Sequence, residues 1–532
     1  MYRWAYRVCA VLLCTALLLS FAGCQKESPY DKGFRIPLSA EPRQLDPQVA
    51  TDEASRTVLL SLFEGLTRLN ENGQVVAGAA ADWEIEEDGR TYTFRLGDSF
   101  WSDGRKVTAA DFVYGFRRAV DPVTGSSLAA LLDNIVGAAE IQAGKKKADT
   151  LGVSAPDADT LVIRLKKADS AFLYTLAFPP FMPCREDFFL ATNARYGLEG
   201  NYVLGNGPFV LDSWSHHSSL LLIRNELYTA REDVYPERVR YMIDAGSVTE
   251  NLEAGTLDVG EITAEEVTAA QKAGAEIRQM SDTIQYLWFN NTLACLSQAQ
   301  VRTALRDSIE WEGLSRLLTA AGQVPATGYA APESVLNDGV YYRTQQNAIA
   351  FVAGGKNMAE RLAAGLNAVG IREMPRLTVL CAEDNASVEL ARYIIQSWQK
   401  NLGLYFQLET VSADSLSSRV EGGQYQIALW ASSAPGNKAT EAFELFTTGA
   451  AGNYAGFSDA SYDALAKKTA NDRAAAEVLE RALTAACPAV PLAFVQTYYA
   501  VAGNTEGIRI HAFDGGVYRV RYDFRHALKY EE

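Results

Sequence analysis

Between about residues 375 and 430, short apolar runs alternate with helical patterns, and this alternation constrains the fold more than any other feature. The central helical pattern covers residues 387–403, where apolar side chains recur on one face and Gly403 supplies a stop. Apolar runs that fit short strands lie at residues 377–380, 404–408 and 425–430. The order strand, helix, strand, helix, strand predicts a parallel sheet, and hence an α/β fold. Ligands of such sheets bind beyond the carboxyl ends of the strands, so Trp430 and the loop after it are candidate site residues.

A second tightly specified stretch covers residues 100–122 and carries no catalytic group. Asp103 and Gly104 favour a tight hairpin turn, because both residues tolerate a positive φ. Thr108 is a candidate N-cap, and Asp111 stands three residues later, where the acid of a capping box belongs. The stretch therefore predicts a hairpin followed by a capped helix.

Two more patterns precede this stretch. Residues 55–70 have the apolar face of a helix that is predicted to end near Gly65. Residues 82–96 alternate on either side of a turn at Asp88 and Gly89, which predicts a hairpin. The apolar residues of its buried face are Trp83, Ile85, Tyr92, Phe94 and Leu96.

Length and charge limit the class of protein. At about 150 residues per domain, a chain of 532 residues suggests about three domains. Hydrophobic residues make up 48% and charged residues 21%, which is ordinary for a folded soluble protein. The net charge of −16 argues against nucleic acid as a partner.

The N-terminus has the pattern of a secretory signal. Arg3 and Arg7 precede an apolar run at residues 8–23, which is followed by Cys24. The phrase "SFAGC" is similar to a lipoprotein signal, in which the cysteine is lipidated and becomes the new N-terminus, although Phe21 stands where leucine is usual. A polar tether would then follow. The alternatives are ordinary cleavage after residue 23 and an uncleaved membrane anchor.

The remaining cysteines do not indicate a disulfide scaffold or a zinc site, because they are widely spaced and form no C-x-x-C pair. They are Cys184, Cys295, Cys381 and Cys487, which we expect to be buried free thiols, with one or two bridges left open. His216 and His217 are adjacent in a turn without a spaced third ligand, so no metal site is expected. We also expect no cofactor.

The sequence also lacks the common motifs of catalytic sites. The sequence contains no H-E-x-x-H, G-x-S-x-G or phosphate-binding glycine loop. Ser397 and Lys400 form an S-x-x-K pair, but the companion elements of penicillin-recognising enzymes are missing and the pair lies within the amphipathic helical pattern. Aromatic residues reach 10%, enough to fill the core and also line a cleft. The chain is therefore not expected to be an enzyme.

Several phrases together resemble the extracytoplasmic solute-binding proteins of ATP-binding-cassette (ABC) importers, in family 5, the peptide/nickel group. Within that group the chain is most similar to oligopeptide-binding lipoproteins. The matching phrases include "EPRQLDP" (residues 41–47), "FWSDGRKVTAADF" (100–112), "GNGPFVL" (205–211) and "NYAGFSDASYDAL" (453–465). They occur in the family's order and extend over nearly the whole mature chain.

The resemblance implies a periplasmic-binding-protein-like α/β fold of the cluster C type, with two hinged lobes and an accessory subdomain beside the first lobe. One hinge crossing is expected at "YLWFNN", residues 286–291. The implied division of the chain is a signal peptide at 1–23, a tether at 24–33, lobe I at 34–75, 205–287 and 500–532, the accessory subdomain at 76–204, and lobe II at 288–499.

The resemblance also indicates where a ligand would bind. Peptide-binding members commonly place an aspartate in a W-x-A-D-Y phrase to pair with the ligand's α-amino group. This chain reads "WASSAPGNKAT" from Trp430, so Ser432 or Ser433 stands at that place. A neutral hydroxyl gives an ammonium group a weaker bond than a carboxylate does.

Three further residues are candidates for the ligand site. Arg419 precedes the last strand much as a ligand-facing arginine does in oligopeptide binders; the alternative is a solvated arginine at a helix end. Thr51 and Glu53 follow "LDP" on a loop that reaches the cleft in relatives. If Glu53 faces inward, its carboxylate would replace the aspartate that pairs with the ligand's α-amino group in the family.

The expected function is that of a monomeric, lipid-anchored extracytoplasmic protein that captures peptides. Lobe closure would deliver them to the permease subunits of an ABC importer. Within the same class, the ligand could instead be an oligosaccharide, a metal chelate or an opine-like solute. From another class, the alternatives are a secreted hydrolase and an anchored receptor with a degenerate cleft.

Overall fold

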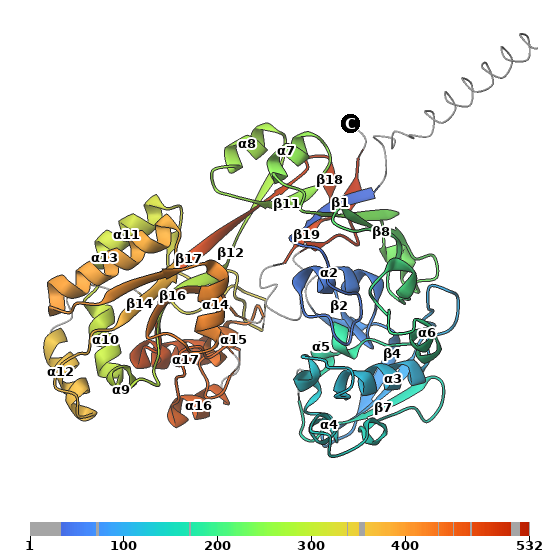
Figure 1. Cartoon of the computed structure of the whole chain (residues 1–532), viewed down its shortest axis with the longest axis horizontal. Helices are drawn as coiled ribbons and strands as arrows, with labels where there is room; N and C mark the ends of the chain where they lie inside the picture. The colour runs from blue at the N-terminus through green and yellow to red at the C-terminus, as the bar shows by residue number, and fades with distance from the viewer. Residues whose placement is uncertain are drawn as a thin grey trace, which may run out of the picture.

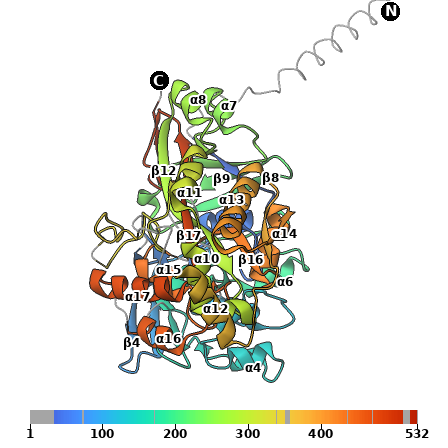
Figure 2. The same ribbon diagram turned by 90° about the vertical axis from the view of Figure 1, so that its left-hand side faces the viewer.

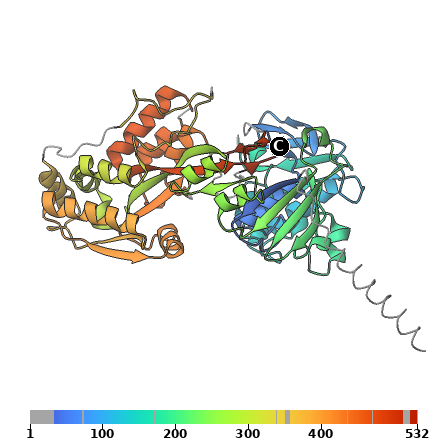
Figure 3. The same cartoon turned by 90° about the horizontal axis from the view of Figure 1, so that it is seen from above.

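The structure, a computed structural model, describes residues 33–530 with short gaps. The gaps are residues 71–73, 170–171, 338, 350–356, 435, 451, 469–470 and 512–521. The chain forms two bodies joined by a narrow region, which Figure 1 shows from the side and Figure 3 from above. The predicted signal peptide and Cys24, the predicted lipidation site, lie outside the described residues.

The larger sheet belongs to the body on the left of Figure 1 and extends into the joining region. Its order is β11 (Val259–Ile262), β17 (Ala489–Val501), β12 (Glu276–Phe289), β16 (Ile427–Ser433), β14 (Thr378–Ala382) and β15 (Gln407–Val411), with β13 (Val324–Pro325) also paired to β17. Strand β14 runs parallel to both β15 and β16, which confirms the parallel sheet predicted from the sequence. The second predicted strand, at residues 404–408, begins three residues later than predicted, since residues 404–406 form a loop.

Helix α13 (Asn385–Leu402) confirms the central helical pattern. Asp384 caps its start by accepting a hydrogen bond from the backbone N–H of Ser387 at 2.8 Å. Gly403 ends it with a φ of 67°, in the region that glycine adopts most readily. The other helices of this lobe are α9 (Ala294–Ser297), α10 (Ala299–Asp307), α11 (Trp311–Ala320), α12 (Met358–Ala368), α14 (Ala413–Glu421), α15 (Ala439–Glu444), α16 (Ala460–Ala466) and α17 (Arg473–Ala486).

The large sheet is buried on both faces within this lobe. Along β12, Tyr286 and Trp288 join the apolar core on one face, whereas Leu287 and Phe289 join the core on the other. Successive side chains of a strand point to opposite faces, so an unbroken apolar run fits a strand covered on both sides.

The other body is built on a four-stranded sheet. Its order is β1 (Gly33–Leu38), β10 (Arg238–Ile243), β9 (Ser219–Arg224) and β8 (Phe209–Ser215), and β1 is parallel to β10. Helix α2 (Glu53–Leu62) packs on this sheet with Asp52 as its N-cap. The helix ends at Leu62, earlier than the predicted end near Gly65, and β2 (Thr67–Leu69) pairs with β3 (Val75–Ala77) beyond it. Helices α7 (Val248–Glu253) and α8 (Val267–Lys272) lie beside β11.

A second four-stranded sheet lies at the lower end of this body in Figure 1. Its order is β4 (Ala80–Ile85), β5 (Thr91–Leu96), β7 (Thr160–Arg164) and β6 (Val153–Ser154). The predicted hairpin is β4–β5, and its turn glycine, Gly89, has a φ of 66°. Strand β5 buries its apolar residues as predicted, but Ile85 is 46% exposed because β4 is an edge strand.

Helix α3 (Ala109–Val120) covers this sheet and has the predicted capping box. The backbone N–H of Thr108 donates to Asp111 Oδ2 at 2.8 Å. Gly104, in the preceding turn, has a φ of 89°. Shorter helices of this part are α4 (Ala138–Gln142), α5 (Phe172–Thr175), α6 (Glu186–Ala191) and the 3₁₀ turn η3 (Pro179–Phe181). Its core is continuous with the core under β1 and α2.

Strands β12 and β17 cross between the two bodies as one long antiparallel ribbon (Figure 1), and Figure 2 shows the two strands side by side. Their pairing extends from Glu276 opposite Val501 to Trp288 opposite Ala489. Two register shifts interrupt it, between Met280 and Thr283 and within the Gln285–Tyr286 step. The predicted crossing at residues 286–291 overlaps the end of β12. The C-terminal segment returns to the body that contains β1, as β18 (Thr505–Glu506), β19 (Arg509–Ile510), β20 (Tyr522–Asp523) and β21 (Leu528–Lys529).

Candidate functional site

Trp430 lies in the middle of β16, just beyond the part of the strand that pairs with β14, and is half-buried. Its indole N–H donates to Ser417 Oγ on α14 at 3.2 Å, and its ring meets Tyr454 edge to face at 4.9 Å. The indole of Trp288 donates to the Trp430 carbonyl at 3.0 Å. These contacts fix the ring in one orientation while leaving part of it accessible, which suits an apolar or aromatic contact with a ligand.

Ser432 and Ser433 are the last two residues of β16, and both are half-buried. They pair with Ile284 and Thr283 of β12, so they lie beside the first register shift of the crossing ribbon. Because side chains alternate along a strand, Ser432 shares a face with Trp430 and Ser433 points to the other face. The structure therefore places Trp430 and Ser432 together, next to the region that joins the lobes.

Arg419 lies on α14 but has a different neighbour. Its guanidinium pairs with both carboxylate oxygens of Glu409 on β15, at 2.6 and 3.3 Å. Ser417, which contacts Trp430, is two residues earlier and thus about 200° away around the helix. The structure does not bring Arg419 to the Trp430 face.

In the other lobe, Glu53 is the first residue of α2 and is exposed. Strands β1 and β10 are parallel, so both end at the same edge of their sheet, and α2 begins beside that edge. A cavity of about 330 Å³ opens there, which we call the α2 start cavity. Its lining includes Leu38, Glu53, Thr57, Asp244, Glu261 and Tyr522. Thr51 is exposed just before this helix, and its carbonyl accepts a hydrogen bond from Arg56.

The charged side chains among the described residues that line the α2 start cavity are all negative. Glu53, Asp244 and Glu261 supply three carboxylates, and no lysine or arginine is among the described residues that line it. Carboxylates gathered in a concave surface attract a cation such as an ammonium group. Asp244 and Glu261 were not predicted as site residues, because they lie just after β10 and within β11, far from Glu53 in the sequence.

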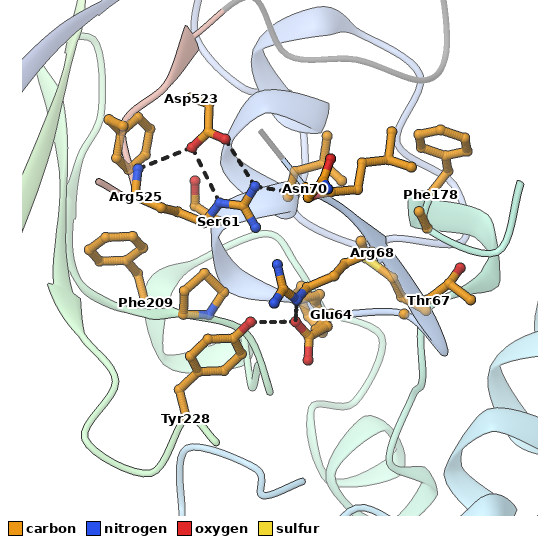
Figure 4. A pocket seen from close by; sticks show the side chains of 18 of the residues that line it. Ser61, Glu64, Thr67, Arg68, Asn70, Phe178, Phe209, Tyr228, Asp523 and Arg525 are labelled. Carbon is orange, nitrogen blue, oxygen red and sulfur yellow. Dashed lines mark hydrogen bonds and ion pairs between the residues drawn. The ribbon is translucent and has the colours of Figure 1, made fainter. Parts of the chain in front are cut away.

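A second cavity, of about 130 Å³, lies further along α2 and is shown in Figure 4. We call it the Arg68 pocket. Arg68 Nε lies 3.8 Å from Glu64 Oε2, and the Tyr228 hydroxyl donates to the same oxygen. Burial raises the pKa of Glu64 above its usual range, against the lowering effect of these two neighbours.

The opposite wall of the Arg68 pocket comes from the C-terminal segment. Arg525 Nη2 donates to Asp523 Oδ2 at 2.9 Å. Although burial opposes ionisation, hydrogen bonds from His511 and Arg525 hold the pKa of Asp523 well below its usual range. The pocket thus joins residues near positions 64, 228 and 524, and no spacing in the sequence signals that they meet.

Signs of other chemistry are few in the part of the chain that the structure describes. No three His, Cys, Asp or Glu side chains there are arranged to hold a metal ion. The four cysteines after the signal region are buried free thiols, as expected. None of the helices within the described ranges has the length and apolar character of a membrane span.

Comparisons with known proteins agree with this architecture. The family model of the bacterial extracellular solute-binding proteins, family 5, matches residues 74–454. The oligopeptide-binding protein OppA of Bacillus subtilis is 28% identical, with 85% of each chain covered. The probable deoxycholate-binding periplasmic protein YgiS of Escherichia coli is 29% identical, with 81% of each chain covered. Among solved structures, Listeria monocytogenes OppA bound to peptide superposes with a TM-score of 0.69 at 23% identity, over 94% of this chain and all of the other.

Proposed function

The chain belongs to the bacterial extracellular solute-binding proteins of family 5, and from this premise we propose that it captures peptides, oligopeptides above all. It would deliver them to the permease subunits of an ABC importer. This is a family of solute-binding proteins rather than of enzymes, and the fold is the two-lobed one of periplasmic binding proteins. The proposed mechanism is closure of the lobes over the ligand.

One arrangement supports this proposal above all others. Ser432 lies at a strand end of one lobe with Trp430 two residues before it, and the α2 start cavity lies at a strand end of the other. The β12–β17 ribbon joins the lobes beside both. A ligand that contacts both surfaces stabilises the closed state in proportion to its extra contacts there. Register shifts in the ribbon are natural points for bending, because ladder hydrogen bonds are interrupted at a bulge.

The ligand's α-amino group needs an anchor in this proposal, because serine replaces the aspartate expected after Trp430. Glu53, with Asp244 and Glu261 beside it in the same cavity, offers carboxylates from the opposite lobe. A charge-assisted hydrogen bond is roughly twice as strong as a neutral one. We assign the ammonium to this cavity and the neighbouring ligand backbone or side chain to Trp430 and Ser432. Arg419 would act on the ligand only after leaving Glu409.

The N-terminal segment completes the proposal. Lipidation of Cys24 would hold the protein at the outer face of the membrane, since each buried acyl CH₂ contributes about 0.8 kcal/mol. The polar tether after it would leave the lobes free to reach a permease as a monomer. Mass spectrometry of the protein isolated from membranes would find diacylglyceryl on Cys24, and an unmodified Cys24 would contradict this part of the proposal.

Calorimetric titration of the purified protein with a diverse peptide library tests the central assignment. Peptides are expected to bind, and N-terminal acetylation is expected to weaken binding because it removes the ammonium. Absence of binding throughout the library would contradict peptide capture.

A second ligand class is favoured by one relative, the probable deoxycholate-binding protein. An amphipathic acid would place its apolar face on Trp430 and Tyr454. The same titration with deoxycholate distinguishes the two, since a bile-acid receptor would bind it more tightly than any peptide of the library.

A further inference from the structure

The α2 start cavity and the Arg68 pocket lie along one face of the same helix. Glu53, Ala54 and Thr57 line the first, Leu60 and Ser61 continue the i, i+4, i+7 spacing into the second, and Glu64 follows just beyond the end of the helix. Tyr522 lines both cavities. In Figure 1, α2 and β2 lie on the side of their lobe that faces the other lobe. The two cavities therefore form neighbouring parts of one surface.

The charged side chains of the α2 start cavity differ from those of the Arg68 pocket. This difference matters for a ligand that has a positive charge at one end and a negative charge at the other. The start cavity carries three carboxylates and no arginine among its described lining residues, whereas the Arg68 pocket contains two arginines alongside two carboxylates, Glu64 and Asp523. Arg525 is already held by Asp523, at 2.9 and 3.2 Å. Arg68 has one ion pair within the described residues, and its 3.8 Å separation from Glu64 is too long for a hydrogen bond. Its guanidinium thus keeps donors for a further anionic acceptor.

The surroundings of Arg68 suit a carboxylate attached to an apolar group. Figure 4 shows the Arg68 side chain reaching from β2 toward Glu64. Glu64 is bonded by Tyr228 and takes up a proton more readily than an exposed glutamate, so it opposes an incoming anion less. The apolar wall consists of Leu60, Phe178, Pro208, Phe209 and Phe524.

The size of the pocket limits what enters it. Its volume of about 130 Å³ is close to that of an engineered cavity of roughly 150 Å³ that binds benzene. One aromatic or large aliphatic side chain fills such a space. A bidentate guanidinium–carboxylate bond at its mouth would fix the group to which that side chain is attached.

We propose that the Arg68 pocket receives the C-terminal residue of the peptide, with the carboxylate on Arg68 and the side chain in the cavity. This rests on the proposed function and specifies its ligand. Glu53 and Ser61 are separated by roughly 12 Å along α2 at 1.5 Å per residue. An extended peptide advances about 3.3–3.6 Å per residue, so one of about four or five residues reaches from the start cavity to Arg68.

The test compares peptides ending in phenylalanine as free acids and as amides, from two to eight residues long, by calorimetric titration. The wild-type protein is expected to prefer the acid at least tenfold at four or five residues and to lose this preference with dipeptides. Arg68→Gln is expected to remove the preference by weakening acid binding, while amide affinity stays within about twofold. Arg164→Gln, at an exposed arginine of β7, is the matched control and keeps the wild-type preference.

Three outcomes separate the claims. Equal binding of acids and amides by the wild-type protein contradicts the C-terminal pocket while leaving peptide capture intact. An acid preference that survives Arg68→Gln, or that is the same at every length, also overturns it. Absence of binding by both acids and amides overturns peptide capture itself and this pocket with it.

Discussion

Arg118 Nη2 on α3 lies 2.7 Å from Asp46 Oδ2, and both side chains are less than a tenth exposed. Arg118 Nη1 also donates to Asp46 Oδ1 at 3.2 Å and to Gln48 Oε1 at 2.7 Å. Asp46 is the acid of the "LDP" phrase, and Arg118 belongs to the helix that follows the predicted hairpin. An acid from one phrase that resembles the family therefore forms a buried ion pair with the helix that begins in another, and this pair attaches α3 to the loop after β1.

Asp46→Asn is expected to lower the free energy of unfolding by about 3–5 kcal/mol, because it leaves the Arg118 charge buried without its partner. Urea denaturation followed by fluorescence measures the loss. Glu84→Gln is the matched control, since Glu84 pairs with Arg95 at an exposed site and such pairs contribute at most about 1 kcal/mol. Equal losses in the two variants would contradict a structural role for the Asp46–Arg118 pair.

Gly115→Ala is expected to destabilise the protein by roughly 1–3 kcal/mol, the cost typical of overpacking. A Cβ at Gly115, on α3, would lie 2.6 Å from the carbonyl oxygen of Met182, just beyond η3. In an exposed helix the same change would be favourable by about 1 kcal/mol, because alanine has the higher helix propensity. Thermal denaturation gives the sign directly, and a raised melting temperature would refute this close approach.

The pH dependence of stability reports on His216. Hydrogen bonds to Glu41 at 2.8 Å and Glu199 at 3.1 Å raise the pKa of His216 above its ordinary value. A raised pKa means that the protonated ring stabilises the folded state below about pH 6.5, the unfolded value. That contribution is lost as the pH rises through the higher, folded-state pKa.

The stability difference between the wild type and His216→Gln is therefore expected to shrink as the pH rises above about 6.5. His217→Gln, at the adjacent exposed histidine, controls for the loss of a ring at this turn. Nuclear magnetic resonance titration of the ring protons gives the pKa itself. A value at or below about 6.5 for His216 would count against the two carboxylate contacts.

Much of the local structure is predictable from the sequence, because it depends on neighbouring residues. The capping box of Thr108 and Asp111, the stop at Gly403 and the turn at Gly89 are all confirmed. The errors arise where tertiary contacts decide. The exposure of Ile85 depends on β4 lying at a sheet edge, and the end of α2 at Leu62 depends on the pairing of β2 with β3.

The candidate site was only partly predictable for the same reason. The carboxyl end of β16 follows from strand order, so Trp430 and Ser432 were accessible to sequence reasoning. The Arg68 pocket was not, since its walls come from segments more than 400 residues apart and local periodicity carries no information on such contacts. The pairing of Arg419 with Glu409 likewise depends on how α14 packs beside β15.

Alternation along β16 gives a prediction about its two terminal serines. Ser432→Ala is expected to weaken peptide binding by about twofold to tenfold, the worth of one neutral hydrogen bond. Ser433→Ala should have little effect, because its side chain points to the face away from Trp430. Calorimetry on the two single variants measures both. A larger effect at Ser433 would mean that the ligand binds on the other face of the strand.

The central claim is that the two lobes close over a ligand that contacts both. Small-angle X-ray scattering of the purified protein, with and without a saturating tight-binding peptide, measures this most directly. The account predicts a smaller radius of gyration with the peptide bound. An unchanged radius of gyration at full occupancy would contradict capture by lobe closure.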